Sequence, residues 1–124
     1  MGAVVKSKHP QAPPFATARE IETFLARPLL ARLCSHNHDG TIHVAPIYFL
    51  FTDGEFLFGT QMKSHKVGNI QRDKGVTVLI DIDTPVLQSV LAYGEATLDT
   101  TDVLEKRVKI LERYYEDPAQ ARAF

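Results

Sequence analysis

The sequence is poor in cysteine, has almost no net charge and contains no long apolar run. Its one cysteine, Cys34, excludes an internal disulfide framework and favours a reducing compartment. The formal net charge of −1 gives no electrostatic basis for general binding to nucleic acid or to an anionic membrane. No apolar run approaches the ~20 residues that span a bilayer, and no signal-peptide or myristoylation pattern opens the sequence. We therefore expect a cytoplasmic protein without nucleic-acid or membrane partners.

Length and composition predict one globular domain. The chain has 124 residues, of which 44% are hydrophobic and 23% charged, as is ordinary for such a domain. Residues 1–14 are rich in proline and lack apolar periodicity. We expect a flexible N-terminal arm over 1–14 and a single domain over 15–124.

The apolar pattern predicts a mainly β chain with flanking helices. Thr17 and Glu20 form a capping box before a first helix, Ser64 and Asp102 precede two more, and Gly75 suits the end of the second. Strands are expected over 29–36, 41–51, 55–60, 76–82 and 86–98. Asp-Gly turns at 39–40 and 53–54 predict hairpins, so the sheet is largely antiparallel. Long strands of this kind favour a small β-barrel. Pro46 is expected at an edge, at a bulge, or where something other than a strand lies alongside.

The segment 58–72, FGTQMKSHKVGNIQR, is the strongest candidate for a binding site. The segment is predicted to form the end of a strand, a polar turn and the start of a helix. Unpaired N–H groups at a helix start favour anions, and Lys63, His65 and Lys66 add cationic or titratable groups there. The sequence therefore predicts a phosphate site, although no glycine-rich motif accompanies it. The simpler alternative is a surface helix capped by Ser64.

Other reactive residues favour structural roles. Cys34, His36 and His38 alternate along one strand, but no further cysteine completes a zinc set, so we expect no metal. No serine lies in a nucleophile-elbow pattern. Asp81 and Asp83 share a strand end before a proline, which favours a solvated turn over acid–base chemistry.

Aromatic residues line the predicted hairpin before the phosphate segment. Most are expected in the core, as cross-strand pairs. Pro46, Ile47 and Tyr48 would nevertheless give a planar ring an apolar wall beside the phosphate site. Lysines beside aromatics could also bind single-stranded nucleic acid, which the near-neutral charge disfavours.

Taken together, these segments resemble the pyridoxamine 5′-phosphate oxidase-like family of FMN-binding split β-barrels. The similarity is carried by RLCSHNHDGTIHVAPIYF, FLFGTQMKSHKVGNIQRD, VLIDID and VLAYGEATL, in that order, over roughly 17–116. The resemblance implies a homodimer with two FMN sites at the interface, each lined by both chains. It implies flavin-mediated hydride or electron transfer with a small-molecule substrate.

The resemblance also implies which residues bind FMN. Thr60, Ser64, His65 and Lys66 match the phosphate end, and His65 stands where relatives often have arginine. The strand against the isoalloxazine ring matches Ala45, Pro46, Ile47 and Tyr48, while Gln88 or Ser89 would come from the partner chain. No catalytic acid or base is assigned.

Two alternatives remain within the same fold. One is a deazaflavin-dependent reductase, whose phosphate-bearing cofactor would also use Lys63 and Lys66. The other is a non-catalytic haem- or flavin-binding protein with His36 or His38 as a ligand. Relatives that oxidise pyridoxamine phosphate continue into a C-terminal segment that helps bind substrate, whereas this sequence ends at Phe124. We therefore expect an oxidoreductase of another substrate.

Overall fold

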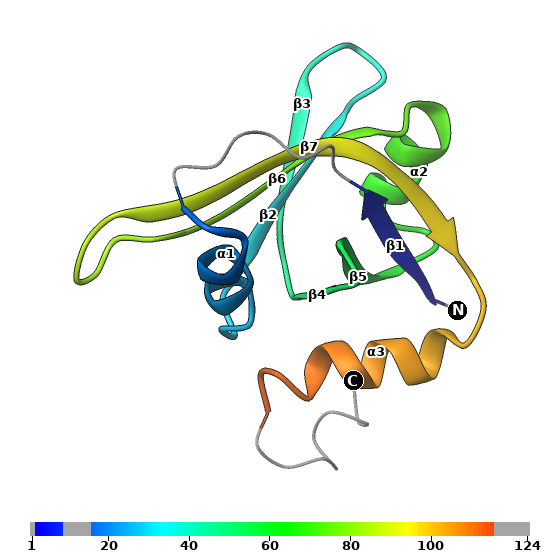
Figure 1. Ribbon diagram of the computed structural model, residues 1–124. Coiled ribbons are helices and arrows are strands. Elements are labelled where there is room, and N and C mark those ends of the chain that lie inside the picture. Colours follow the sequence, from blue (N-terminus) through cyan, green and yellow to red (C-terminus); the bar gives the residue numbers. More distant parts are fainter. Residues whose placement is uncertain (1, 9–15, 116–124) are drawn as a thin grey trace.

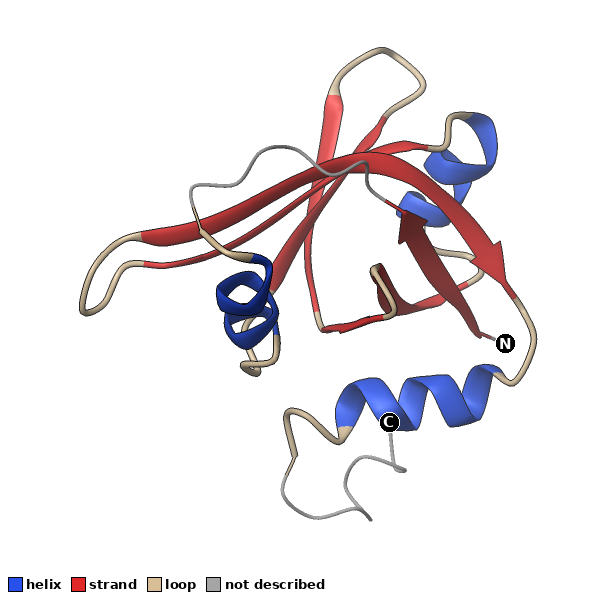
Figure 2. Ribbon diagram, viewed as in Figure 1, coloured by secondary structure: helices blue, strands red, loops and turns tan. Residues whose placement is uncertain are grey.

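The computed structural model describes residues 2–8 and 16–115, which form seven strands and three helices (Figure 2). In chain order these are β1 (Gly2–Lys8), α1 (Ala18–Leu25), β2 (Ala31–His36), β3 (Ile42–Ile47), β4 (Phe49–Thr52), β5 (Glu55–Gln61), α2 (His65–Arg72), β6 (Gly75–Ile82), β7 (Gln88–Asp99) and α3 (Val103–Leu111). The mainly β, antiparallel class predicted from the sequence is confirmed. No helix in the described chain is long and apolar enough to cross a membrane.

The strands form one strongly curved antiparallel sheet in the order β3-β2-β6-β7-β1-β5-β4 (Figure 1). Its two outermost strands, β3 and β4, are neighbours in the chain, separated only by Tyr48. The sheet must therefore curl until these edges approach one another. Among the described strands no ladder pairs β3 with β4, so the barrel stays split at this place.

The flexible arm expected over 1–14 is not what the described part of this segment forms. Residues 2–8 form β1, which pairs with β5 on one side and with β7 on the other. Residue 1 and residues 9–14 lie outside the described chain. β1 supplies backbone partners to two strands that would otherwise have open edges, which explains why a short, weakly patterned segment becomes a strand.

The strand expected over 41–51 is divided at Tyr48 into β3 and β4. The division follows from the curled sheet, because one continuous strand cannot lie at both of its edges. Pro46 lies on β3, an outermost strand, where its missing N–H removes no ladder bond. Of the three kinds of position expected for Pro46, the structure has the edge strand.

The core fills the inside of the curved sheet. Phe49 and Phe51 on β4 lie opposite Phe58 and Phe56 on β5, as the Asp-Gly turn at 53–54 predicts. These rings pack with Leu33, Val78 and Ile80, and α1 closes one side with Leu25. The predicted capping box of α1 is present, since Glu20 N donates to Thr17 Oγ1 over 3.1 Å.

Two helices determine the geometry near the split. α2 packs on β2 and β7, and α3 lies across β5, β1 and β4. The second helix ends at Arg72 with Asp73 as its C-cap, so Gly75 opens β6 instead of capping the helix. Asp73 is extended there, and the chain passes directly into β6 without a left-handed glycine.

Candidate functional site

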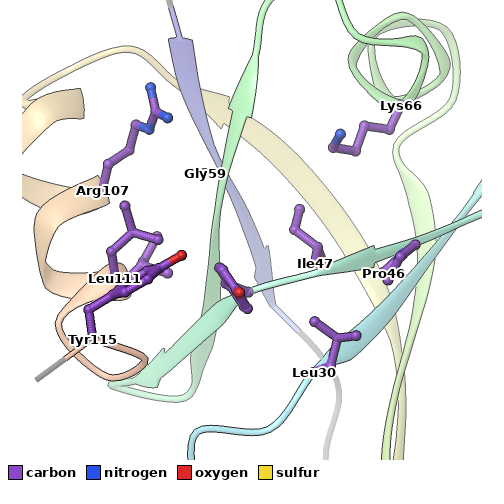
Figure 3. Close-up of a pocket in the computed structure, with 10 residues that line it drawn as sticks. Leu30, Pro46, Ile47, Gly59, Lys66, Arg107, Leu111 and Tyr115 are labelled. Carbon is purple, nitrogen blue, oxygen red and sulfur yellow. The ribbon is translucent and has the colours of Figure 1, made fainter. Parts of the chain in front are cut away.

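A pocket of about 590 Å³ opens beside Tyr48, where the barrel is split. Its walls come from the end of β3, the middle of β5, the start of α2 and the last turns of α3 (Figure 3). The lining residues are Leu30, Pro46, Ile47, Tyr48, Gly59, Lys66, Arg107, Ile110, Leu111 and Tyr115. This volume lies within the range of small-molecule and cofactor sites.

The walls are largely apolar and held by aromatic contacts. Pro46 and Ile47 line the β3 side, and Leu111 the α3 side. The Tyr48 ring stacks on Tyr114, with centroids 4.1 Å apart, and meets Tyr115 edge-on at 6.4 Å. Tyr48 is nevertheless 38% exposed, and it lines the pocket. Such a wall suits a flat aromatic ligand.

Lys66 is a cation at the edge of these walls. Its side chain extends from the first turn of α2 toward the pocket (Figure 3). Burial lowers the pKa of the Lys66 ammonium. Within the described chain it forms no hydrogen bond or ion pair. A partly buried ammonium without a protein partner favours an anionic ligand.

The turn before α2 places hydroxyl groups near Lys66. Thr60 is buried at the end of β5, and its Oγ1 lies 3.0 Å from Ser64 Oγ. Ser64 is the N-cap residue by position, but its side chain makes no capping bond to the helix backbone. The simpler interpretation, a helix capped by the Ser64 hydroxyl, is therefore wrong in its detail. The first backbone N–H groups of α2 remain available to a ligand.

The α3 side of the pocket was missed by sequence reasoning. Arg107 crosses Gly59 of β5 so closely that a Cβ on Gly59 would lie 3.3 Å from Arg107 Cγ. Ile110 and Leu111 follow in the last turn of α3, and Tyr115 lies beyond the end of the helix; all three line the pocket. The sequence predicted a helix after Asp102, but it gave no sign of which residues of that helix would line a pocket.

Comparison with known proteins identifies the family. A family model described as pyridoxamine 5′-phosphate oxidase matches residues 17–124, most of the chain. The chain belongs to the pyridoxamine 5′-phosphate oxidase family. Among solved structures, the conserved hypothetical protein Rv2991 from Mycobacterium tuberculosis is similar, with a TM-score of 0.74 and 26% identity over 89% of this chain and 73% of that one. No curated protein matches the sequence.

Three of the four strand residues that family resemblance predicts to face a flavin ring, Pro46, Ile47 and Tyr48, line the pocket. Ala45 lies next to them on β3, opposite Leu33 of β2, but does not line it. At the phosphate end, Lys66 lines the pocket. Thr60, Ser64 and His65 lie around the same turn, outside the lining.

Gln88 and Ser89, predicted to come from the partner chain, lie at the start of β7. Both are exposed and neither lines the pocket of its own chain. Ser89 shares a sheet face with Leu91 and Tyr93, since side chains alternate along a strand. Their contribution to a site therefore remains a prediction about an assembly.

The remaining candidates lie elsewhere. In the described residues no group of three His, Cys, Asp or Glu side chains could hold a metal ion. His36 and His38 are exposed at the β2–β3 hairpin, outside the pocket lining. Burial raises the pKa of the Cys34 thiol, which disfavours its thiolate. Asp81 pairs with Arg32 over 2.7 Å, a structural contact.

Proposed function

We propose that this protein binds FMN in the pocket at the split and acts as a flavin-dependent oxidoreductase. The ring would lie against Ala45, Pro46, Ile47 and Tyr48. Thr60, Ser64, His65 and Lys66 would hold the phosphate. FMN supplies hydride and electron transfer when bound, and the protein supplies binding, orientation and access.

The position of Lys66 is the observation that carries this proposal. The lysine places a cation beside an apolar wall, at a helix start, with no anion of the described chain to pair with it. A phosphate attached to a flat ring system has matching chemistry. Its anionic end would pair with the ammonium and the α2 N–H groups, while the ring would cover Pro46 and Ile47.

A homodimer with shared sites is part of the proposal. One row of side chains, Val44, Cys34, Thr77 and Tyr93, runs across β3, β2, β6 and β7 on the outer face. Val44 is 55% exposed and Tyr93 is 60% exposed. An apolar sheet face of this kind favours association with a second copy. The partner would bring Ser89, on the same face, and the adjacent Gln88 toward the first chain's pocket.

The alternative cofactors have weaker support. A deazaflavin cofactor would use the same wall and the same lysine, so it stays the alternative ligand. Haem ligation by His36 or His38 has no support from the pocket, which neither histidine lines. A cytoplasmic location remains part of the proposal, on the basis of the single cysteine.

Titration of the purified protein with FMN and with riboflavin tests the proposal. FMN binding quenches or shifts flavin fluorescence, and we expect FMN to bind at least tenfold more tightly than riboflavin, which lacks the phosphate. Equal affinity for the two would contradict the phosphate assignment. Absence of binding for both would refute the flavin site.

A further inference from the structure

The pocket at the split has two cationic side chains in its lining, and none of the described residues that line it is acidic. Lys66 extends from the first turn of α2, and Arg107 extends from the middle of α3. The remaining walls are mostly apolar. In such surroundings a charge acts more strongly on a ligand than it does in water, because water screens it less. The pocket therefore favours a ligand that carries negative charge or gains it.

Arg107 is held at the pocket wall where α3 crosses β5. Its side chain passes over Gly59, where a Cβ would lie 3.3 Å from Arg107 Cγ, 3.5 Å from Nε and 3.8 Å from Cδ. Nε belongs to the guanidinium, so the charged group begins beside Gly59, which itself lines the pocket. A guanidinium has five N–H donors and keeps its positive charge, so a contact of Arg107 within the chain leaves donors for a ligand.

The two cations lie on different walls of the pocket. Figure 3 shows Lys66 and Arg107 on opposite sides of β5, the strand that carries Gly59. In the proposed site, Lys66 and the N–H groups at the start of α2 pair with the phosphate. Arg107 belongs to another helix, and its neighbours in the lining are the apolar residues Ile110 and Leu111. Its charge would therefore act on the ring and not on the phosphate.

The ring of FMN changes its charge when it is reduced. The oxidised isoalloxazine ring is neutral. Uptake of two electrons and one proton, equivalent to a hydride, leaves the reduced ring with one negative charge at neutral pH, and protein charge near the ring tunes this change. A fixed positive charge stabilises the anionic form of a neighbouring group over its neutral form. A cation on the ring side of the pocket would therefore favour the reduced cofactor.

We propose that Arg107 makes the pocket bind reduced FMN more tightly than it would without this residue, relative to oxidised FMN. This role of Arg107 rests on the proposed FMN site. Tighter binding of the reduced form raises the reduction potential of the bound cofactor. The arginine thus favours the half-reaction in which the flavin accepts a hydride from a substrate. Gly59 contributes by leaving space for the arginine side chain at the pocket wall.

Reduction of the FMN-loaded protein with dithionite, beside a redox dye of known potential, measures this preference. Arg107→Met removes the charge but keeps an unbranched side chain over Gly59. We expect its ratio of affinities for reduced and oxidised FMN to fall about tenfold, which lowers the potential of a two-electron couple by about 30 mV. Arg107→Gln is also neutral and should show the same fall. Lys109→Met, the matched control, removes the same charge from an exposed position of α3 outside the pocket lining and should leave the potential unchanged.

Equal potentials for wild type and the neutral Arg107 variants would overturn the inference while leaving the FMN site intact. An equal fall in Lys109→Met would also overturn it, because the net charge of the protein would then explain the effect. Riboflavin has the same ring without the phosphate, so at saturating concentration it should show the same difference between wild type and Arg107→Met. A difference confined to FMN would assign Arg107 to the phosphate instead. Wild type that binds no FMN would refute the proposed function itself.

Discussion

Two lysines in the same turn illustrate how position separates a binding residue from a surface charge. Lys63 is exposed in the turn before α2 and does not line the pocket. Lys66 is partly buried on the first turn of the helix and lines it. Their chemistry is the same, so the difference in environment comes from position: Lys63 lies in the turn and Lys66 on the helix.

Lys66→Ala should weaken FMN binding by about 1.5–3 kcal/mol, the worth of a hydrogen bond between charged groups. Lys63→Ala is the matched control and should change the dissociation constant little, because that side chain is exposed. Fluorescence titration of the two variants checks this. Equal effects of both substitutions would show that only general positive charge matters.

At the level of single residues, the sequence predicts a residue's position where the local chemistry of that residue determines it. Because Pro46 lacks a ladder donor, it was expected at an edge, at a bulge or beside something other than a strand, and it lies on an edge strand. Arg107 and Tyr115 could not be predicted as pocket residues. Their place depends on the angle at which α3 crosses β5, which no local pattern encodes.

Among the elements, the turn that follows α3 holds the segments that frame the pocket. Arg113 donates to Phe49 O, to Leu25 O over 2.8 Å and to Arg27 O over 2.6 Å. Tyr114 Oη donates to Leu29 O over 2.7 Å and accepts from Phe49 N at 3.1 Å. The α1–β2 connection and the start of β4 are thus joined through one helix end.

Tyr114→Phe tests this connection. The substitution keeps the ring that stacks on Tyr48 but leaves Phe49 N and Leu29 O without the hydroxyl. We expect the free energy of unfolding to fall by about 1–3 kcal/mol, the cost of leaving such groups unpaired. Lys63→Ala, at an exposed side chain of the turn before α2, is the control and should change it little. Urea unfolding of both variants provides the comparison.

Asp99 connects three elements at the other end of the barrel. It lies at the end of β7 and contacts Lys6 of β1 at 2.8 Å and Lys106 of α3 at 2.5 Å. Hydrogen bonds from Lys106, Lys6 and Thr101 hold the pKa of this carboxyl well below its usual range. Its stabilising effect is therefore complete above about pH 4, the usual carboxyl pKa, and is lost as the pH falls below that value.

Asp99→Asn should lower the free energy of unfolding at pH 7 by about 1–2 kcal/mol, allowing for solvent screening of the two lysines. The difference from wild type should shrink as the pH falls below about 4, because the Asp99 carboxyl of the unfolded chain gains a proton there while the folded chain keeps it ionised, and this proton uptake stabilises the unfolded state. Urea unfolding across this pH range is the measurement. A difference that does not vary with pH would mean that the charge of Asp99 has no part in the effect.

Helices and strands could be predicted where adjacent residues in the sequence specify them. The capping box at Thr17 and the Asp-Gly turn at 53–54 each specified an element from adjacent residues. β1 was missed because its partners, β5 and β7, lie some fifty to ninety residues further along the chain. The break at Tyr48 was missed because it results from closure of the whole sheet.

At the scale of the whole molecule, the exposed apolar face on β3 and β7 is the reason to expect a dimer. Ile42, Val44, Leu91 and Tyr93 are all more than half exposed on β3 and β7. Water contact with such a face is unfavourable, and a second copy would remove it. The fold places Ser89 on the same face, which links assembly to the proposed site.

Val44→Glu should therefore convert a dimer into a monomer and weaken FMN binding at the same time. Leu104→Glu introduces the same charge at a 62% exposed leucine of α3 and should leave the dimer intact. Analytical ultracentrifugation with bound-flavin absorbance follows both properties together. If a monomeric variant kept its full affinity for FMN, the partner chain would have no part in the site.

The absorption spectrum of the freshly purified protein, followed by identification of whatever heat releases, tests the central claim most directly. The account predicts flavin bands and release of FMN, or, for protein purified without cofactor, the appearance of those bands after addition of FMN. A colourless protein that also fails to take up added FMN would contradict the proposed flavin site.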